Sequence, residues 1–330
     1  MPAVSPLLGS AGAVPPPDAW PDQDVAWHYG DPLREQRSLA PGGPGLVDLS
    51  NRPVVRIDGA DRLSWLHSLT SQHVEHLAPG ESALSLILSP HGHVEHELHL
   101  VDDGESVWMS VEPGTSEALV VYLDSMRFML RVDVTDVSDA WAVVWEPVRE
   151  RVAGAPTWLT PEPWAEGVSG HAFAGREVFV PRASLPAYAA GRDLAGTWAW
   201  NAVRVAAGVP RLGLETDHRT IPHEVGWIGP AVHLDKGCYR GQETVARVQN
   251  LGRPPRRLVL LHLDGSSDLV LPVPGDPVEV DGRAVGVVGT SVQHHELGPV
   301  ALALVKRALP PDTVVSAAGV PASQEVVVEP

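Results

Sequence analysis

The apolar positions between residues 46 and 207 recur with two periods, one typical of strands and one typical of helices. Continuous or alternating apolar runs predict strands at 46–49, 54–57, 84–88, 93–101, 106–112, 132–137, 141–146 and 177–180. Helices are predicted at 61–70, where Asp61 is the expected N-cap, and at 115–130, 182–190 and 197–207. Strands interrupted by helices in this way indicate an α+β layer.

The alternating segment at 93–101 assigns faces to its polar residues. His96 shares one face with leucines, whereas Glu97 and His99 lie on the other face. Residues 149–175 are dense in Pro, Gly, Thr and Trp and predict only a connector.

The two ends of the chain differ from its middle in composition and in predicted secondary structure. Short strands separated by Gly, Pro and Asp turns are predicted at 258–263, 277–280, 284–293 and 300–305, which is typical of a small barrel or sandwich. The first 20 residues are rich in Ala, Pro and Gly and predict a disordered tail. The predicted division is a disordered tail over 1–25, an α+β core over 26–253 and a β unit over 254–330.

The stretch Lys236–Glu243 reads Lys-Gly-Cys-Tyr-Arg-Gly-Gln-Glu. It follows an apolar run at 231–234, which predicts a strand, and it precedes a helix predicted over 244–251 with Gly252 as its C-terminal cap. The octet is therefore predicted to be a strand-to-helix turn. Its two glycines allow positive φ or a close approach of another group.

If this turn is extended, Lys236, Cys238 and Arg240 alternate onto one side. Two cations beside a thiol favour the thiolate, which is the reactive and metal-binding form of cysteine. The alternative is a tight turn that holds a buried, inert cysteine and two solvated cations.

The amino-acid composition excludes several classes of function. Lys and Arg total 24 and Asp and Glu total 41, so the net charge is −17, and nucleic-acid binding is not expected. The single cysteine excludes an intramolecular disulfide and a cluster held by several thiolates of this chain. No signal peptide or apolar stretch of about 20 residues is present, so we expect a cytoplasmic protein that does not bind membranes.

The segment Lys236–Arg247, KGCYxGQExxxR, resembles the signature of the YgfZ family of folate-binding proteins. That family is related to the aminomethyltransferase of the glycine cleavage system and to mitochondrial iron–sulfur assembly proteins of the same fold. Further similar segments are 48–50, 58–61, 66–70, Leu88–Gly92, Arg204–Pro210, 286–291 and 301–307. The resemblance implies two interleaved α/β subdomains around a folate pocket, closed by a C-terminal antiparallel β-barrel.

The resemblance also implies tetrahydrofolate-dependent maintenance of iron–sulfur enzymes. Folate and iron–sulfur assembly proteins or client enzymes would be the partners. Cys238 and Lys236 are the implied catalytic residues, with Cys238 ligating a cluster transiently or exchanging with a mixed disulfide. The candidate cofactor-binding residues are Tyr239, Arg240, Gly241, Gln242, Glu243, Arg247, His96 and Arg204. Tyr239 either stacks on a pterin or covers the turn, and Gln242 and Glu243 also suit turn fixing and helix capping.

A folate-dependent aminomethyltransferase or demethylase is the alternative function. Its relatives carry a Gly-Gly-x-x-Asp-Asp-Leu segment, and the counterpart here, Gly92–Leu98, has His96 and Glu97 at the two Asp positions. A glutamate that contacts the pterin in those relatives is replaced by Ala206. Both differences weaken this alternative, although His96 remains a candidate base.

A metal site is the third possibility considered. Four histidines lie close together in the sequence, at positions 91, 93, 96 and 99. Their spacing straddles both faces of the predicted strand, whereas a zinc site needs three or four convergent ligands. We therefore expect exposed strand histidines and predict no metal site.

Overall fold

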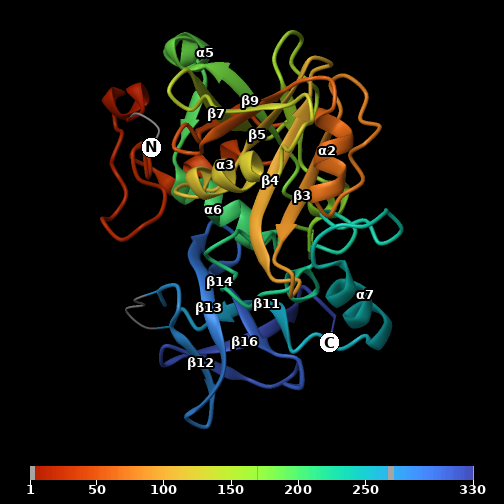
Figure 1. The fold of residues 1–330 in the computed structure, drawn as a ribbon. Coiled ribbons are helices and arrows are strands. Elements are labelled where there is room, and N and C mark those ends of the chain that lie inside the picture. Colours follow the sequence, from red (N-terminus) through yellow and green to blue (C-terminus); the bar gives the residue numbers. More distant parts are fainter. Residues whose placement is uncertain (1–3, 169, 267–270, 330) are drawn as a thin grey trace.

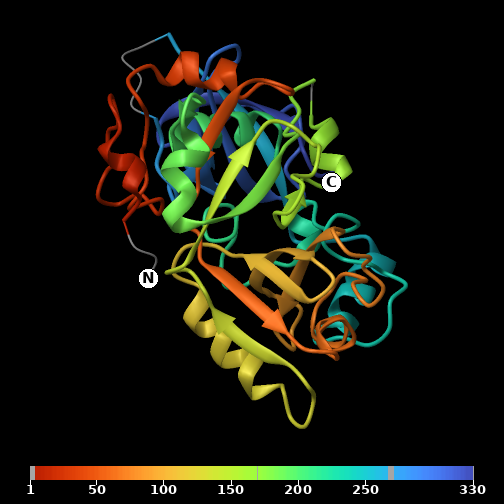
Figure 2. The same cartoon turned by 90° about the horizontal axis from the view of Figure 1, so that it is seen from above.

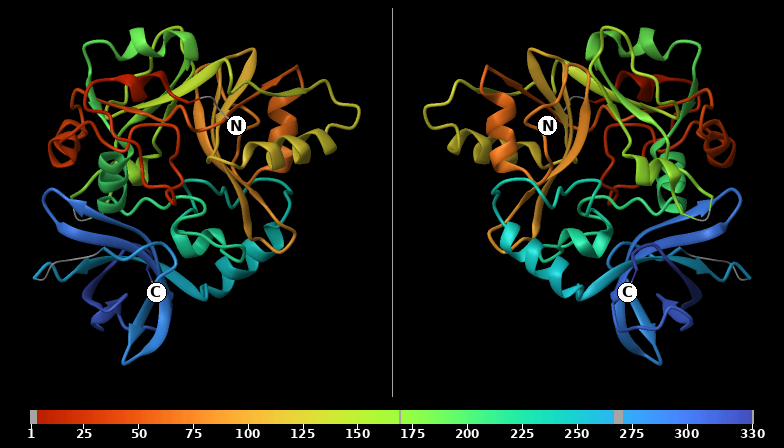
Figure 3. Two further views of the ribbon diagram at one scale, coloured as in Figure 1. Left: turned by 90° about the vertical axis from the view of Figure 1, so that its left-hand side faces the viewer. Right: turned by 90° about the vertical axis from the view of Figure 1, so that its right-hand side faces the viewer.

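The computed structural model describes residues 4–168, 170–266 and 271–329. Two five-stranded sheets and a barrel form three neighbouring units (Figure 1). The side views show the barrel on one side of both sheets, with α7 reaching from the barrel toward the tip of the β3–β4 hairpin (Figure 3). Among the described residues, no helix has the length and apolar character needed to cross a lipid bilayer.

The two sheets are interleaved along the chain. The first sheet has the order β10-β1-β7-β9-β8 and the second has the order β3-β4-β5-β2-β6. The first comprises β1 Gly45–Asp48, β7 Trp141–Glu146, β8 Thr157–Leu159, β9 Arg176–Pro181 and β10 Asp193–Ala195. The second comprises β2 Val54–Asp58, β3 Ser82–Leu88, β4 Val94–Asp102, β5 Ser106–Ser110 and β6 Asp133–Asp136. The chain thus enters the first sheet, builds the whole second sheet and then returns, as the predicted interleaving requires.

Helices cover the outer faces of the sheets and fill the junction with the barrel. They are α1 Pro32–Ser38, α2 Arg62–Leu69, α3 Ser116–Ser125, α4 Glu162–Glu166, α5 Leu185–Ala189, α6 Thr197–Ala206 and α7 Gln242–Leu251, with 3₁₀ turns η1 Pro6–Gly9, η2 Arg182–Ser184 and η3 Pro222–Val225. Leu66 of α2 and Leu119 of α3 share a buried cluster with Leu98 of β4. Seen from above, α3 lies at the outer side of the second sheet (Figure 2).

The C-terminal unit is a closed antiparallel barrel with the order β11-β14-β13-β12-β15-β16. Its strands are β11 Arg256–Leu263, β12 Pro277–Val280, β13 Arg283–His294, β14 Gly298–Lys306, β15 Val315–Ala317 and β16 Val320–Val326. Pairing of β16 with β11 closes the barrel and leaves no edge strand. The predicted fold class, interleaved α/β subdomains followed by an antiparallel barrel, is therefore confirmed.

Several local predictions differ from the structure. The apolar run at 231–234 is not a strand, because it makes only a single bridge between Val232 and Ile228. Asp61 does not cap α2 with its side chain; its carboxylate pairs with Arg131 at 2.7 Å. The predicted connector at 149–175 contains β8 and α4, and β15 and β16 were not predicted.

The expectation of a disordered tail over 1–25 is wrong for residues 4–25, whereas residues 1–3 lie outside the described part. The Ser5 hydroxyl donates to buried Asp48, and Leu7 is buried. Asp22 is 1% exposed and receives two hydrogen bonds from Arg211, at 2.6 and 2.8 Å. The Ala-, Pro- and Gly-rich composition of this segment does not allow it to form a hydrophobic core of its own. It is ordered because a few of its side chains pack into the core of the first sheet and pair with Arg211.

Candidate functional site

The motif loop is held in place by close backbone packing against the β3–β4 turn. Gly241 has φ +84°, and a Cβ there would lie 2.6 Å from the Ser89 carbonyl oxygen and 3.0 Å from the Gly92 Cα. A Cβ on Gly92 would in turn lie 2.8 Å from the Thr244 Cβ. Two segments matched separately in the sequence, Leu88–Gly92 and the octet, therefore meet in the structure, and each needs its glycine for the meeting.

Lys236 is buried and ties the loop to the end of α2. Its Nζ donates to the main-chain carbonyls of His67 and Thr70 and, at 3.2 Å, to that of Gln72. The last carbonyls of a helix lack partners within the helix, so a lysine is well suited to satisfy them. The Nζ also lies 5.1 Å from the ring centroid of Tyr239.

Burial changes the ionisation of both side chains. It lowers the pKa of Lys236 to about 8, an effect that the attraction of Glu75 only partly offsets. Burial also raises the pKa of Tyr239 to about 12, so its hydroxyl is neutral at physiological pH.

Cys238 is exposed and free, so the alternative is wrong in expecting a buried cysteine. Its two cationic neighbours have other partners. Arg240 pairs with Glu95 at 3.1 Å and lies 5.4 Å above the Tyr122 ring, whereas Lys236 turns inward to the carbonyls of α2. Both cations are therefore engaged by partners other than the thiol, and the predicted grouping of the three side chains stays a prediction.

A cavity of about 520 Å³ lies beside the loop, between it and α7. Its lining combines apolar and polar side chains: Leu234, Asp235, Lys236, Tyr239, Gln242, Glu243, Val245, Ala246, Gln249 and Asn250. The volume is within the range of small-molecule sites. Tyr239, which lines this cavity, directly follows the exposed Cys238 in the sequence.

The remaining motif residues divide between the turn and the surface. The Gln242 side chain accepts a hydrogen bond from the Tyr239 backbone N–H at 3.1 Å, which fixes the turn. Glu243 is exposed at the start of α7 and lines the cavity. Arg247 is exposed on α7.

The interface between the two sheets holds a second polar cluster. On β4, Glu97 and His99 face the first sheet, and the His99 Nδ1 lies 2.8 Å from a Glu177 oxygen. The His99 ring stacks on Trp158 with centroids 3.9 Å apart, and the Ser110 hydroxyl donates to Glu177. Burial alone would lower the pKa of His99, but the attraction of Glu177 outweighs it and raises that pKa.

Buried arginines extend this cluster toward the barrel. Arg211 pairs with Asp22 at 2.6 Å and with Glu112 at 2.9 Å. Arg204 of α6 pairs with Glu215 at 2.9 Å and donates to the Thr290 hydroxyl of β13 at 2.6 Å. Sequence reasoning missed these arginine contacts except for Arg204 itself, since bonded partners such as Asp22 and Arg211 lie 189 residues apart.

The network fills the interface where the resemblance placed a folate pocket. The void left among these side chains is about 20 Å³, which is the room of about one water molecule. Glu97 accepts a hydrogen bond from the Leu212 backbone N–H at 3.2 Å, and Ala206 is buried. Among the described residues, these side chains bind one another, and the void that they enclose is smaller than a pterin.

His96 lies on the other face of β4, as its predicted alternation with Glu97 requires. It is 8% exposed, and burial lowers its pKa to about 4, so the ring is neutral at neutral pH. Its Nδ1 has no hydrogen-bond partner among the described residues. The carboxylate of Glu97 therefore does not occupy the side of the strand that His96 occupies.

Comparison with known proteins gives several relatives at low identity. The chain is 24% identical over 269 residues to a chloroplast protein of Arabidopsis thaliana whose name describes a transferase, covering 74% of this chain and 61% of that protein. It is 28% identical over 305 residues to an aminomethyltransferase of Geobacillus kaustophilus, covering 83% and 82%. It is 24% identical over 260 residues to a mitochondrial iron–sulfur cluster assembly factor homologue of Cryptococcus neoformans, covering 68% of each. No protein-family model matches the chain.

Among solved structures, the glycine cleavage system aminomethyltransferase T of Bartonella henselae matches with a TM-score of 0.79 and 17% identity, covering 97% of this chain and 95% of that one. The chain therefore has the aminomethyltransferase fold. Its sequence relatives include both aminomethyltransferases and an iron–sulfur cluster assembly factor.

Proposed function

We propose that this chain is a folate-binding accessory protein of the YgfZ type, which acts in the assembly or repair of iron–sulfur clusters through the Cys238 thiolate. The observation that carries the proposal is an exposed, single thiol on a loop whose Lys236 and Tyr239 line a cavity of about 520 Å³. The complete KGCYxGQExxxR match and the similarity to an iron–sulfur cluster assembly factor support the same function.

The motif cavity fits a folate better than the sheet interface does. The interface leaves about 20 Å³, whereas the motif cavity offers about 520 Å³ with both apolar and polar lining. Glu243 and Asn250 would hold the hydrogen-bonding edge of a pterin, and Tyr239 would cover its ring. A bound reduced folate would supply a one-carbon carrier there.

Cys238 meets the requirements for handling a cluster as cargo. Its exposure lets another protein reach the sulfur, and loss of the thiol proton to water gives the form that binds iron. One thiolate cannot hold a cluster alone, so the remaining ligands would come from the partner that delivers or receives it. Lys236 acts as a positioning residue, since its Nζ anchors the loop to α2.

The test is complementation in a strain that lacks the chromosomal copy. Cys238→Ala is expected to abolish recovery of iron–sulfur enzyme activity at normal protein levels, whereas Gly237→Ala, on the same loop and with nothing within 4 Å of its added Cβ, retains it. Full recovery with Cys238→Ala would remove the thiolate from the function.

Aminomethyl transfer is the second candidate, favoured by the 28% identity to the Geobacillus enzyme. Against it, His96 and Ala206 stand at positions of carboxylates in the transferases, and Glu97 is bonded to His99 and Leu212. Incubating the chain with tetrahydrofolate and an aminomethyl donor tests it directly. We expect no turnover, and steady formation of methylenetetrahydrofolate would establish the transferase activity instead.

A further inference from the structure

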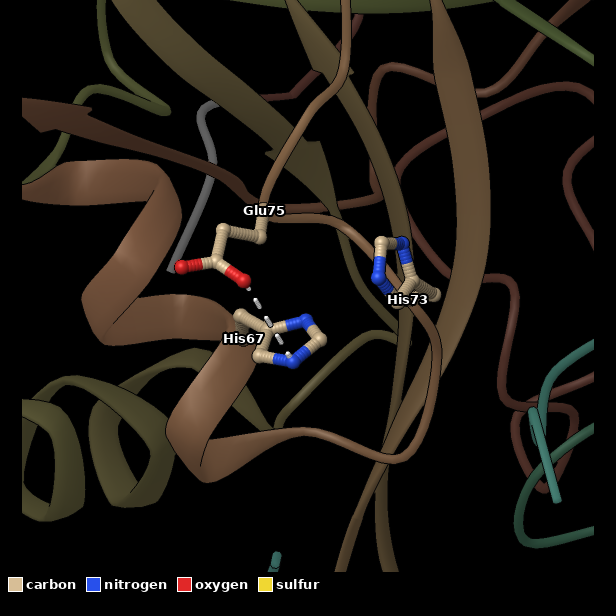
Figure 4. Close-up of side chains that lie close together, drawn as sticks. All are labelled: His67, His73 and Glu75. Carbon is tan, nitrogen blue, oxygen red and sulfur yellow. Dashed lines mark ion pairs between the residues drawn. The ribbon is translucent and has the colours of Figure 1, made fainter. Parts of the chain in front are cut away.

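A cluster of histidines and one glutamate lies at the end of α2, outside the cavity already described. His67, His73 and Glu75 each offer one ligand atom, and these atoms lie within 4.8 Å of one another. The His67 Nε2 lies 3.9 Å from a Glu75 oxygen, and the His67 and His73 rings meet edge to face with centroids 4.8 Å apart. Figure 4 shows the three side chains converging from the helix and from the loop that follows it.

We propose that His67, His73 and Glu75 form a binding site for a divalent first-row transition-metal ion such as Zn²⁺ or Fe²⁺. Two imidazoles and one carboxylate on one side of the ion, with positions left open, are a donor set that such ions prefer. Mg²⁺ and Ca²⁺ prefer oxygen ligands and do not suit it.

The backbone holds these ligands on one side. Val74 is fully buried between His73 and Glu75, so the two flanking side chains are turned outward together. His67 lies in the last turn of α2, and its Nδ1 is buried with no partner among the described residues. An imidazole without a fixed hydrogen bond remains available to a metal.

The ligand atoms of His67, His73 and Glu75 would have to move only slightly closer together to bind one ion. Metal–ligand bonds of about 2.0–2.2 Å bring the ligand atoms to roughly 3.0–3.5 Å from one another. His73 and Glu75 are both exposed on a loop, so side-chain rotation is enough to shorten the separation of up to 4.8 Å. The C-terminus of α2 and the Glu75 charge attract a cation, while Lys236, bonded to the His67 carbonyl, opposes one.

Two further histidines lie beside the site. The His76 ring centroid is 5.7 Å from that of His73, which makes His76 the candidate for a fourth ligand. His233 is 5.6 Å from His73, but its Nδ1 accepts a hydrogen bond from the Asp235 backbone N–H, so its neutral ring carries a proton on Nε2. His233 is therefore a neighbour of the site and not a ligand.

The site is joined to the motif loop through the backbone. Thr70 and Gln72, whose carbonyls hold Lys236, lie between His67 and His73 in the sequence. An ion that joins His67 to His73 would close this short loop and hold both carbonyls in place. The inference concerns residues outside the motif cavity and stands whether or not a folate binds there.

The test is metal binding by the untagged full chain. We expect one Zn²⁺ per chain by calorimetry, visible d–d bands with Co²⁺ as the probe, Fe²⁺ binding without oxygen, and no binding of Mg²⁺. The double variant His73→Gln/Glu75→Gln should weaken Zn²⁺ binding by about tenfold or more, since even groups that only orient a ligand contribute that much. Both side chains are exposed, so the circular dichroism of the variant should match that of the wild type.

The matched control is His91→Gln/His93→Gln, which removes two histidines with ring centroids 6.1 Å apart at another turn. This variant should bind Zn²⁺ within about twofold of the wild type, because the proposed ligands are intact. Absence of stoichiometric Zn²⁺ binding by the wild type would overturn the proposal. Loss of binding in the control, with binding retained in the His73/Glu75 variant, would overturn it as well.

Discussion

At the scale of single residues, Lys236 is the group whose ionisation is most open to measurement. The chain has two lysines, Lys236 and Lys306, so reductive ¹³C-methylation gives two side-chain signals, and Lys306→Arg assigns them. The Lys236 signal should titrate near pH 8, because burial disfavours the charged form. A midpoint near the ordinary value of 10.5 would show that its carbonyl partners outweigh burial.

The same shift has a consequence for stability. Because the pKa of Lys236 is lower in the folded state, the unfolded chain binds more protons between pH 8 and 10.5. Lys236 therefore contributes a rise in stability with increasing pH over that interval.

The buried pair of His99 and Glu177 should contribute strongly to stability at neutral pH. Glu177→Gln is expected to lower the free energy of unfolding by about 3–5 kcal/mol, since it removes the nearer of the two carboxylates that pair with the buried His99 ring and leaves only Glu97 at 3.5 Å. The pKa of His99 is raised above 6.5, so the contribution is complete below that pH and is lost as the pH rises through the raised value. Urea unfolding at several pH values measures it.

The control for that variant is Glu325→Gln, which removes a partly exposed partner of His262 at the same distance of 2.8 Å. It should cost about 0–1 kcal/mol. Equal losses in the two variants would contradict the role of burial.

At the scale of elements, the junction of the motif loop with the β3–β4 turn depends on Gly241. Gly241→Ala should destabilise the chain by about 1–3 kcal/mol, because φ is +84° and the new Cβ meets the Ser89 carbonyl oxygen at 2.6 Å. Gly237→Ala, with free space around its Cβ, should change stability much less. Comparing urea midpoints decides the matter, and a larger effect at Gly237 would refute the packing described.

Strands could be predicted from the sequence where they pair with a neighbouring strand on both sides and where recognisable turn residues flank them. Residues 141–146 and 277–280 match β7 and β12 because apolar runs there end at turn residues. The run at 231–234 failed because Ala231 and Val232 are buried as a loop in the core, without a neighbouring strand. β8 was missed because a three-residue edge strand leaves too short a pattern to recognise.

At the scale of the whole molecule, Arg211 joins the N-terminal segment to the second sheet. Arg211→Ala should lower the free energy of unfolding by about 3–5 kcal/mol, since it removes the arginine that pairs with buried Asp22 and leaves Glu112 only its pair with Arg52. The variant should also make residues 4–25 sensitive to proteolysis. Arg149→Ala, which removes a mostly exposed pair with Glu162, should cost about 0–1 kcal/mol, and an equal loss would contradict this account.

The fold and the motif could be predicted from the sequence, whereas the buried ion pairs between the two sheets could not. The order of strands and the octet identify the fold by resemblance, and the exposed thiol agrees with its position on a turn. Contacts such as Asp22 with Arg211, 189 residues apart, leave no local pattern. The cavity beside α7 was equally hidden, since it depends on how Lys236 turns inward.

The central claim is that the motif loop and α7 form the folate site, and calorimetric titration with tetrahydrofolate tests it most directly. The wild type should bind one equivalent, and Ala246→Trp, which fills the cavity, should weaken binding by about tenfold or more, at least 1.4 kcal/mol. Ala187→Trp, an exposed alanine on α5, and Cys238→Ser should bind like the wild type. Absence of binding by the wild type, or unchanged binding by Ala246→Trp, would contradict the claim.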